Sequence, residues 1–283
     1  MEQCQADASS WSVATRALAS RSLVARPIEA RPILARMPDE TLARAPGRVI
    51  ERLPFTIRRV QNDDDMRKAV RVRYAAYARH VPEFARTLVE PEAADYADDT
   101  IVLLAESKLD GSALGSTRIR TNLLGPLDME ASLILPDWLQ GRRLVEASRL
   151  GVGYGRESRL VKLALIKACF AYCEDNDIDY SVATARAGVD RQYEQLTFID
   201  VFPDRAPIPL HHVGNIPHRV MAFDIESFEV RWQAARHPLL DFFFHTLHPD
   251  IDIHRGAEAL RMPVPREGIC IGQQAARRGL AAS

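Results

Sequence analysis

The sequence is poor in cysteine and in long apolar stretches. Only four cysteines occur in 283 residues, Cys4, Cys169, Cys173 and Cys270, which is too few for a disulfide scaffold. This low content suits a reducing compartment, so we expect a cytoplasmic protein. No stretch approaches the ~20 apolar residues of a membrane span, and the first residues contain acids and no apolar segment of signal-peptide length. The sequence therefore predicts neither export nor membrane insertion.

An excess of charge of either sign is also lacking. The 37 Lys and Arg residues balance 38 Asp and Glu residues, which gives a formal net charge of -1. Such a balance offers no general attraction to a nucleic acid, and we expect no nucleic-acid partner. Any surface that binds a charged partner must be local. The 47% hydrophobic content is enough for a large buried core.

The order of composition and pattern divides the chain into four parts. Residues 1–52 mix Ala, Arg, Ser and Pro without a sustained apolar period, which predicts a flexible leader. We expect an ordered domain over 53–227, a carboxy-terminal helical extension over 228–260 and a tail over 261–283. Apolar alternation predicts strands at 55–60, 100–106, 114–120, 143–152, 180–184, 207–213 and 219–225. Helical spacing predicts helices at 63–80, 159–175 and 188–198, and helical material broken by Pro238 at 228–247. This order predicts an α/β fold with one mixed sheet.

Glu146 is the informative residue, because it interrupts an otherwise apolar strand. Burial of a carboxylate without a partner is costly. One interpretation is a structural ion pair with Arg149 or Arg118, and the other is a general base. Strict alternation places Glu146 and Ser148 on one face of the strand and Arg149 on the other, unless the strand bulges. We therefore expect Arg118 to be the direct partner of Glu146, and Arg149 to hold the strand and neighbouring acids in place.

Four short motifs follow one another along the chain. They are Arg73 with Tyr77 four residues on, Asp95 with Asp98, Arg118 in Gly115-Ser-Thr-Arg118, and Glu146-Ala-Ser-Arg149. Together they resemble the ordered motif set of the acyl-homoserine-lactone (autoinducer) synthases and the N-acyl amino acid synthases. Both groups have the GNAT acyltransferase fold, and the resemblance covers roughly residues 55–225. It implies a GNAT-like, mostly antiparallel central sheet with splayed middle strands, flanked by helices and followed by carboxy-terminal helices.

The resemblance also implies the acyl donor and its site. The donor would be a thioester on the phosphopantetheine of acyl carrier protein, in the splay between strands 143–152 and 180–184, with no tightly bound cofactor. The residues expected along the donor arm are Leu150, Gly151, Val152, Gly153 and Tyr154, and backbone N–H groups near Leu150 to Val152 would face the oxyanion.

The turn Gly153-Tyr-Gly-Arg-Glu-Ser158 departs from the Arg/Gln-x-x-Gly-x-Gly/Ala turn of coenzyme A users, whose backbone N–H groups hold a pyrophosphate. This departure favours a carrier protein as donor. Arg156, Arg159 and Lys162 are then candidates for docking its acidic surface, the alternative being an ordinary solvated helix edge.

The acceptor separates the two groups of synthases, because autoinducer synthases use S-adenosylmethionine and the others use a free amino acid. Autoinducer synthases usually have a tryptophan shortly after the position of Tyr77, and this chain has none there. The sequence thus predicts an N-acyl amino acid synthase. Glu146 would be the catalytic base, assisted by Arg149. The residues expected to bind or position the acceptor are Arg73, Tyr77, Asp95, Asp98, Arg118 and Ser148. An autoinducer synthase and a non-catalytic binding module with the same buried charges are the alternatives.

Thiol and metal chemistry are not expected. Cys169 and Cys173 lie four apart on an apolar helix, as small core residues do. The histidines at 211, 212, 237, 245 and 248 have no acid or cysteine at metal-ligand spacing in the sequence. We therefore predict no metal site.

Overall fold

The structure is a computed structural model that describes residues 49–254, so most of the predicted leader and the whole predicted tail lie outside the described residues. Its strands are β1 (Val49–Ile50), β2 (Phe55–Arg59), β3 (Thr100–Ser107), β4 (Ala113–Thr121), β5 (Leu144–Val152), β6 (Tyr180–Ala185), β7 (Ile199–Asp200), β8 (Ile208–Leu210), β9 (Ile216–Asp224), β10 (Thr246–Leu247) and β11 (Ile251–Asp252). Its longer helices are α1 (Asp63–Ala78), α3 (Ser158–Asp175), α4 (Asp190–Gln195) and α5 (Phe228–Ala235). Shorter turns are α2 (Pro82–Ala85), η3 (Arg86–Leu88), η4 (Ala93–Tyr96), η5 (Asp128–Ala131), η6 (His211–Val213) and the π-helical η7 (Asp241–His245).

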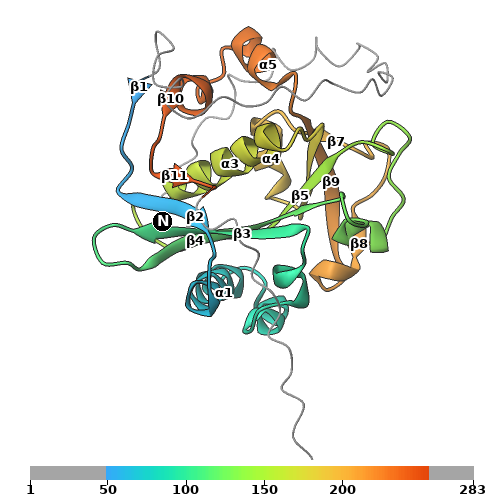
Figure 1. Cartoon of the computed structure of the whole chain (residues 1–283). Coiled ribbons are helices and arrows are strands. Elements are labelled where there is room, and N and C mark those ends of the chain that lie inside the picture. The colour runs from blue at the N-terminus through green and yellow to red at the C-terminus, as the bar shows by residue number, and fades with distance from the viewer. Residues whose placement is uncertain (1–48, 255–283) are drawn as a thin grey trace, which may run out of the picture. The chain divides into compact units, whose positions relative to one another are not determined.

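The main sheet has the strand order β11-β2-β3-β4-β5-β6-β9-β7, with β8 paired to β9 (Figure 1). Only the β11–β2 and β5–β6 pairs are parallel. The β5–β6 ladder extends from Leu144 opposite Tyr180 to Ala147 opposite Ala183, whereas β5 continues to Val152. The two middle strands therefore part beyond Ala147. The expected mixed, mostly antiparallel sheet with splayed middle strands is confirmed.

Helices cover both faces of this sheet, with α1 on one face and α3 on the other (Figure 1). Asn62 caps α1 as its spacing predicts, because its side-chain oxygen accepts a hydrogen bond from the Asp65 N–H at 3.0 Å. Two glycines allow the close approach of the layers. A Cβ atom at Gly151 would lie 2.9 Å from the Cα atom of Arg73 in α1, and one at Gly115 would lie 2.8 Å from Val161 in α3.

The segment after β9 completes the same fold. Phe228, Trp232 and Phe243 pack into an aromatic cluster with Phe170 of α3 and Phe223 of β9. The sequence predicted helical material here, and α5 and η7 agree with it, whereas β10 and β11 were not predicted. Two-residue strands carry no readable alternation, and their partners are distant in sequence. The described part of the chain contains no helix long and apolar enough to cross a membrane.

Lys167 of α3 fastens this segment to the fold. Its ammonium donates hydrogen bonds to the carbonyl oxygens of Phe242 and Thr246, both at 2.6 Å, and contacts His248 Nδ1 at 2.8 Å. β11 then pairs with β2, and Ile253 is buried beside it in the core that α3 forms on the sheet. Residues 228–253 therefore share the cores of the domain that the sequence analysis ended at residue 227.

Candidate active site

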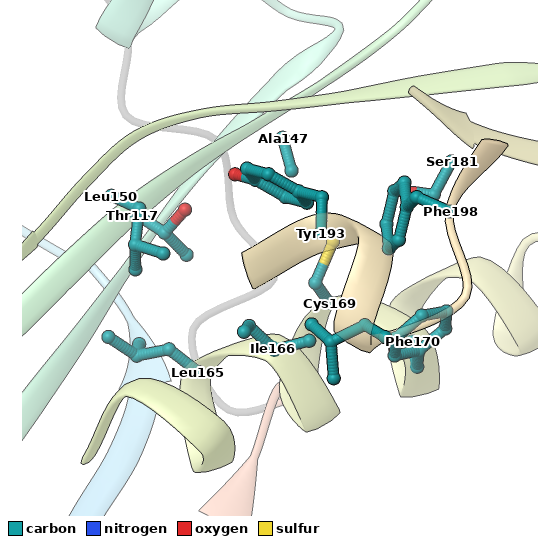
Figure 2. Close-up of a pocket in the computed structure, with 11 residues that line it drawn as sticks. Thr117, Ala147, Leu150, Leu165, Ile166, Cys169, Phe170, Ser181, Tyr193 and Phe198 are labelled. Carbon is teal, nitrogen blue, oxygen red and sulfur yellow. The ribbon is translucent and has the colours of Figure 1, made fainter. Parts of the chain in front are cut away.

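An apolar cavity lies on the α3 face of the sheet, where β5 and β6 part (Figure 2). It encloses about 440 Å³ of empty space, part of which is open to solvent. Its lining comes from β4, β5, β6, α3, α4 and the segment after α4: Thr117, Ala147, Leu150, Leu165, Ile166, Cys169, Phe170, Ser181, Tyr193, Leu196 and Phe198. Burial raises the pKa of Tyr193, whose side chain lines this cavity.

Arg149 lies in a β-bulge of β5. The register of β5 against β4 shifts between the pairs Ser148–Arg118 and Gly151–Ser116, which leaves one extra residue on β5. Arg149 adopts φ 54°, in the left-handed region that residues other than glycine rarely enter. The bulge turns its side chain to the face of Glu146 and Ser148. Strict alternation, which would place Arg149 on the opposite face, therefore does not hold here.

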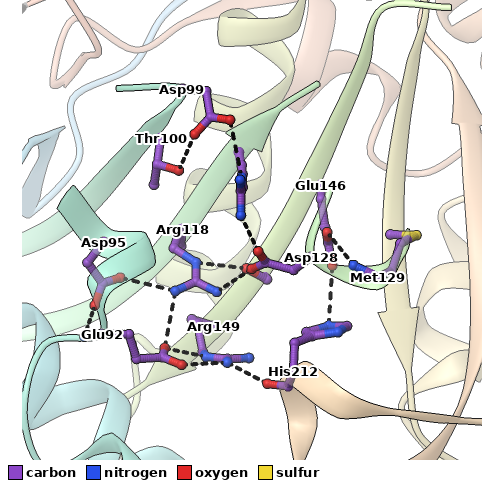
Figure 3. A network of polar contacts seen from close by, with 12 residues as sticks. Glu92, Asp95, Asp99, Thr100, Arg118, Asp128, Met129, Glu146, Arg149 and His212 are labelled. Carbon is purple, nitrogen blue, oxygen red and sulfur yellow. Dashed lines mark hydrogen bonds and ion pairs between the residues drawn. The ribbon is translucent and has the colours of Figure 1, made fainter. Parts of the chain in front are cut away.

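Arginine side chains and carboxylates interlock on that face (Figure 3). Arg73 forms a fork on Asp95, with nitrogen–oxygen distances of 2.9 and 3.0 Å. Arg118 donates to Glu92 at 3.2 Å and to Asp128 at 2.8 Å. Arg149 donates to both carboxylate oxygens of Glu92, at 2.6 and 2.7 Å. We call these six residues, together with Arg120 and Asp99, the arginine cluster.

The arginine cluster keeps Asp95 and Glu92 ionised. Burial acts in the opposite direction, but the charges of Arg73 and Arg118 and the hydrogen bonds from Arg73 lower the pKa of Asp95. Arg149 and its neighbours do the same for Glu92. Arg73 and Arg118, which were expected to bind or position the acceptor, thus donate to the protein's own acids.

Glu146 stands beside the arginine cluster without an arginine partner. Its side chain is 1% exposed, and Oε2 accepts a hydrogen bond from the Met129 N–H at 3.3 Å. The expected ion pair with Arg118 is wrong, because Arg118 is occupied by Glu92 and Asp128. Burial, with the negative charge of Asp128 added, raises the pKa of Glu146 to about 7. A carboxyl group with this pKa can both take up and release a proton near neutral pH.

His212 of η6 lies beside the second oxygen of Glu146. Its Nε2 lies 3.3 Å from Glu146 Oε1, outside hydrogen-bond geometry, and Arg149 fixes the turn by donating to the His212 carbonyl oxygen at 2.7 Å. Burial and the charge of Arg149 lower the pKa of His212 to about 4, so its ring is neutral near pH 7. Sequence analysis missed this residue, because the acid beside it lies 66 positions earlier in the chain.

Buried polar atoms without a hydrogen-bond partner gather at this site. Within residues 49–254, seven such side-chain atoms occur, and only His248 Nε2 lies elsewhere. The others are Arg73 Nε, Ser116 Oγ, Glu146 Oε1, Arg149 Nη1 and both ring nitrogens of His212. Because buried polar groups are nearly always paired, this concentration indicates a place where a polar ligand supplies the partners.

Other predicted site residues are placed in different ways. Ser148 accepts a hydrogen bond from Arg118 Nε at 3.3 Å, and Tyr77 packs on Phe84, whose ring also lies under the Arg149 guanidinium at 5.2 Å. Asp98 is exposed and is not part of the arginine cluster. Its neighbour Asp99 belongs to the cluster and pairs with Arg120 at 3.3 Å. Glu92 and Asp128 were missed, because they lie in loops without periodicity.

The segment predicted to hold the donor connects the bulge to α3. Leu150 lines the cavity, and Gly151 and Val152 end β5. Gly153 and the exposed Tyr154 form the turn before α3, which Ser158 closes by donating to the carbonyl oxygens of Gly153 and Gly155, both at 2.7 Å. The basic side chains at this end differ, because Arg156 and Arg159 are exposed, whereas Lys162 is half-buried and bonded to Gln192 of α4.

Comparison with known proteins finds solved structures with a similar fold. No protein-family model and no curated protein matches the chain. Among solved structures, FeeM, an N-acyl amino acid synthase from uncultured soil microbes, has a TM-score of 0.49 at 15% identity over 66% of this chain and 96% of its own. BjaI, a coenzyme A-dependent acyl-homoserine lactone synthase, has a TM-score of 0.46 at 18% identity over 71% of this chain and 95% of its own.

A third solved structure, a putative GNAT-family acetyltransferase from Desulfovibrio desulfuricans, has a TM-score of 0.44 at 15% identity over 60% of this chain and 99% of its own. The activities in these descriptions belong to those proteins. In the part of this chain that the structure describes, no group of three or more His, Cys, Asp or Glu side chains is arranged to hold a metal ion.

Proposed function

We propose that this chain is an N-acyltransferase that moves a fatty acyl group from an acyl carrier protein thioester to the amine of an amino acid. The observation that carries the proposal is Glu146, a buried carboxyl group with a pKa of about 7 and no cationic partner, on the strand that also lines the apolar cavity. An acceptor amine is mostly ammonium near neutral pH, and attack on a thioester requires removal of a proton. Glu146 is the base for that step.

The two substrates would bind on opposite faces of β5. The acyl chain would enter the cavity on the α3 face, beside Ala147 and Leu150. The thioester carbonyl would lie where β5 and β6 part, so that the amine reaches it from the side of Glu146. Backbone N–H groups after the bulge, from Leu150 to Val152, would meet the oxyanion, and such donors are worth roughly 3 to 4 kcal/mol each in other enzymes. No covalent enzyme intermediate is required.

The acceptor carboxylate requires a guanidinium nitrogen that does not already donate to an acid of the protein. Arg73 and Arg118 point their forks at internal acids, whereas Nη1 of Arg149 has no partner among the described residues. We therefore propose that Arg149 Nη1 binds the acceptor carboxylate while its other nitrogens hold Glu92. The acceptor ammonium then faces Glu146.

A carrier protein as donor fits the exposed Arg156 and Arg159 at the turn before α3. A bound carrier would bring acidic side chains to these guanidinium groups, and added salt would weaken that contact. Rates with an acyl carrier protein and with the matching acyl coenzyme A, each measured at low and high salt, distinguish the two donors. With a carrier protein as the natural donor, the KM for the carrier thioester should be lower than that for the matching acyl coenzyme A, and it should rise with added salt.

The test of the function is product analysis. The chain is expressed in a bacterial host beside Glu146→Gln, and organic extracts are analysed by mass spectrometry. We expect N-acyl amino acids with the wild-type chain and none with Glu146→Gln. Acyl lactones in place of N-acyl amino acids would assign an autoinducer synthase, and the absence of both from cells that contain folded protein would refute acyl transfer.

A further inference from the structure

We propose that His212 carries the proton from Glu146 to solvent after each acyl transfer. This inference rests on the proposed function and adds to it a residue that acts through Glu146. It starts from the position of the His212 ring, which lies 3.3 Å from Glu146 Oε1 and has no hydrogen-bond partner at either nitrogen among the described residues (Figure 3).

The stoichiometry of the proposed reaction requires such an exit. An ammonium and a thioester give an amide, a free thiol and one proton: R–NH₃⁺ + R′C(O)–SR″ → R′C(O)–NHR + HS–R″ + H⁺. The proton taken by the Glu146 carboxylate therefore does not leave with either product. Because the Glu146 side chain is 1% exposed and that of His212 is 9% exposed, His212 is the neighbour closer to water.

The transfer of the proton from Glu146 to His212 breaks one bond and forms another. The O–H bond of the Glu146 carboxylic acid breaks and an N–H bond forms at His212 Nε2, so the ring must begin with its proton on Nδ1. Both ring nitrogens are buried in this structure, so the imidazolium must turn outward before it releases the Nδ1 proton to water, and exchange with water then restores the first tautomer. His212 is neutral near pH 7 and is thus free to accept, and its low pKa makes the imidazolium short-lived.

The surroundings keep the His212 ring neutral at rest and leave Glu146 divided between its carboxylate and its acid near pH 7. The charged and titratable groups that face the pair are Asp128 of η5, Arg118 of β4, Arg149 of β5 and His218 of β9. Arg149 opposes a charge on His212 and also holds its backbone carbonyl. The turn is therefore fixed while the ring is not, as a group that exchanges protons requires.

The test uses the full chain and the substrates identified by product analysis, with release of free thiol as the readout. His212→Gln and His212→Ala are compared with His211→Gln, because His211 is the adjacent, exposed histidine of the same turn. We expect kcat to fall about 100-fold in both His212 variants in dilute buffer, which is the lower end of the range for a lost proton-transfer group. The control should keep the wild-type kcat.

Rescue separates a proton carrier from a structural residue. Imidazole added to His212→Ala should restore kcat at least severalfold, with a dependence on pH that follows the concentration of imidazole base. Wild-type kcat in His212→Gln, or a loss in both His212 variants that imidazole does not relieve, overturns the inference. A wild-type chain without acyl transfer fails the proposed function instead. Thermal unfolding of each variant checks that a lost rate is not a lost fold.

Discussion

The arginine cluster and the Glu146–His212 pair lie on the same face of the same sheet, yet they treat buried charge in opposite ways. In the cluster every carboxylate meets at least one guanidinium group, and the pKa values of Asp95 and Glu92 are lowered. In the pair the carboxyl has no arginine, and burial raises the pKa of Glu146 to about 7 and lowers that of His212 to about 4. The first arrangement fixes loops, and the second leaves a neutral imidazole beside a carboxyl group whose protonation can change near pH 7. The comparison indicates that the arginine cluster supports the fold, whereas the Glu146–His212 pair can take part in proton transfer.

The largest effect is expected when the pair is broken at its acid. Glu146→Gln keeps the shape and the Met129 contact but removes the base, so kcat/KM should fall about 10²- to 10⁴-fold. The free energy of unfolding at pH 8 should not fall, because a costly buried carboxylate has been removed. Steady-state kinetics and urea unfolding measure the two quantities. Near-wild-type kcat/KM in this variant would contradict the assignment of Glu146 as base.

Breaking the cluster should instead affect stability first. Arg118→Leu leaves the carboxylates of Glu92 and Asp128 without their shared cation, and removal of one partner of a buried ion pair costs about 3 to 5 kcal/mol. Urea unfolding at pH 7 measures the loss. Arg67→Leu is the matched control, because its pair with Asp64 is exposed and should contribute little. Equal effects of the two substitutions would show that the cluster is not a scaffold.

The pair should also give the protein a particular pH dependence. Because the folded pKa of Glu146 is raised from 4.5 to about 7, its contribution to stability is fully present below pH 4.5 and is lost as the pH rises through about 7. Relative to the wild type, Glu146→Gln should therefore gain about 3 kcal/mol of unfolding free energy between pH 4.5 and pH 8. Urea unfolding at several pH values measures this gain, and a constant difference between the two proteins would contradict the raised pKa.

His212 should show the opposite sign. Its pKa is lowered from 6.5 to about 4, so its contribution is present above pH 6.5 and is lost as the pH falls through about 4. His212→Gln removes this term, and the variant should therefore become less sensitive to acid than the wild type over that interval.

The smallest effect is expected at Arg149, which belongs to both regions. Arg149→Lys retains a cation for Glu92 but loses the planar fork and the unpartnered Nη1. We expect KM for the amino acid to rise roughly tenfold with little change in kcat, since a charged hydrogen bond in the complex is lost. Kinetics with the amino acid as the varied substrate tests this. A fall in kcat with unchanged KM would place Arg149 in the chemical step instead.

The sequence predicted the long elements and the residues of the site better than it predicted their contacts. β2 to β6, α1 and α3 follow from apolar periodicity, which reports the core that each element faces. The burial of Glu146 followed from its apolar neighbours. The bulge could not be predicted, because the positive φ of Arg149 is set by the register of β5 against β4 and not by the local sequence pattern. Loop residues such as Glu92 and Asp128 carry no period, and only folding brings them to Arg118.

The hydrogen bonds that Lys167 donates to the segment after α5 have a practical consequence for anyone who shortens this chain to grow crystals. An end placed after β9 would delete the carbonyl oxygens of Phe242 and Thr246, to which the Lys167 ammonium donates hydrogen bonds. It would also strip β2 of its parallel neighbour and uncover the aromatic side chains under α5. Such a fragment should aggregate, so a trimmed version should retain residues through Ile253.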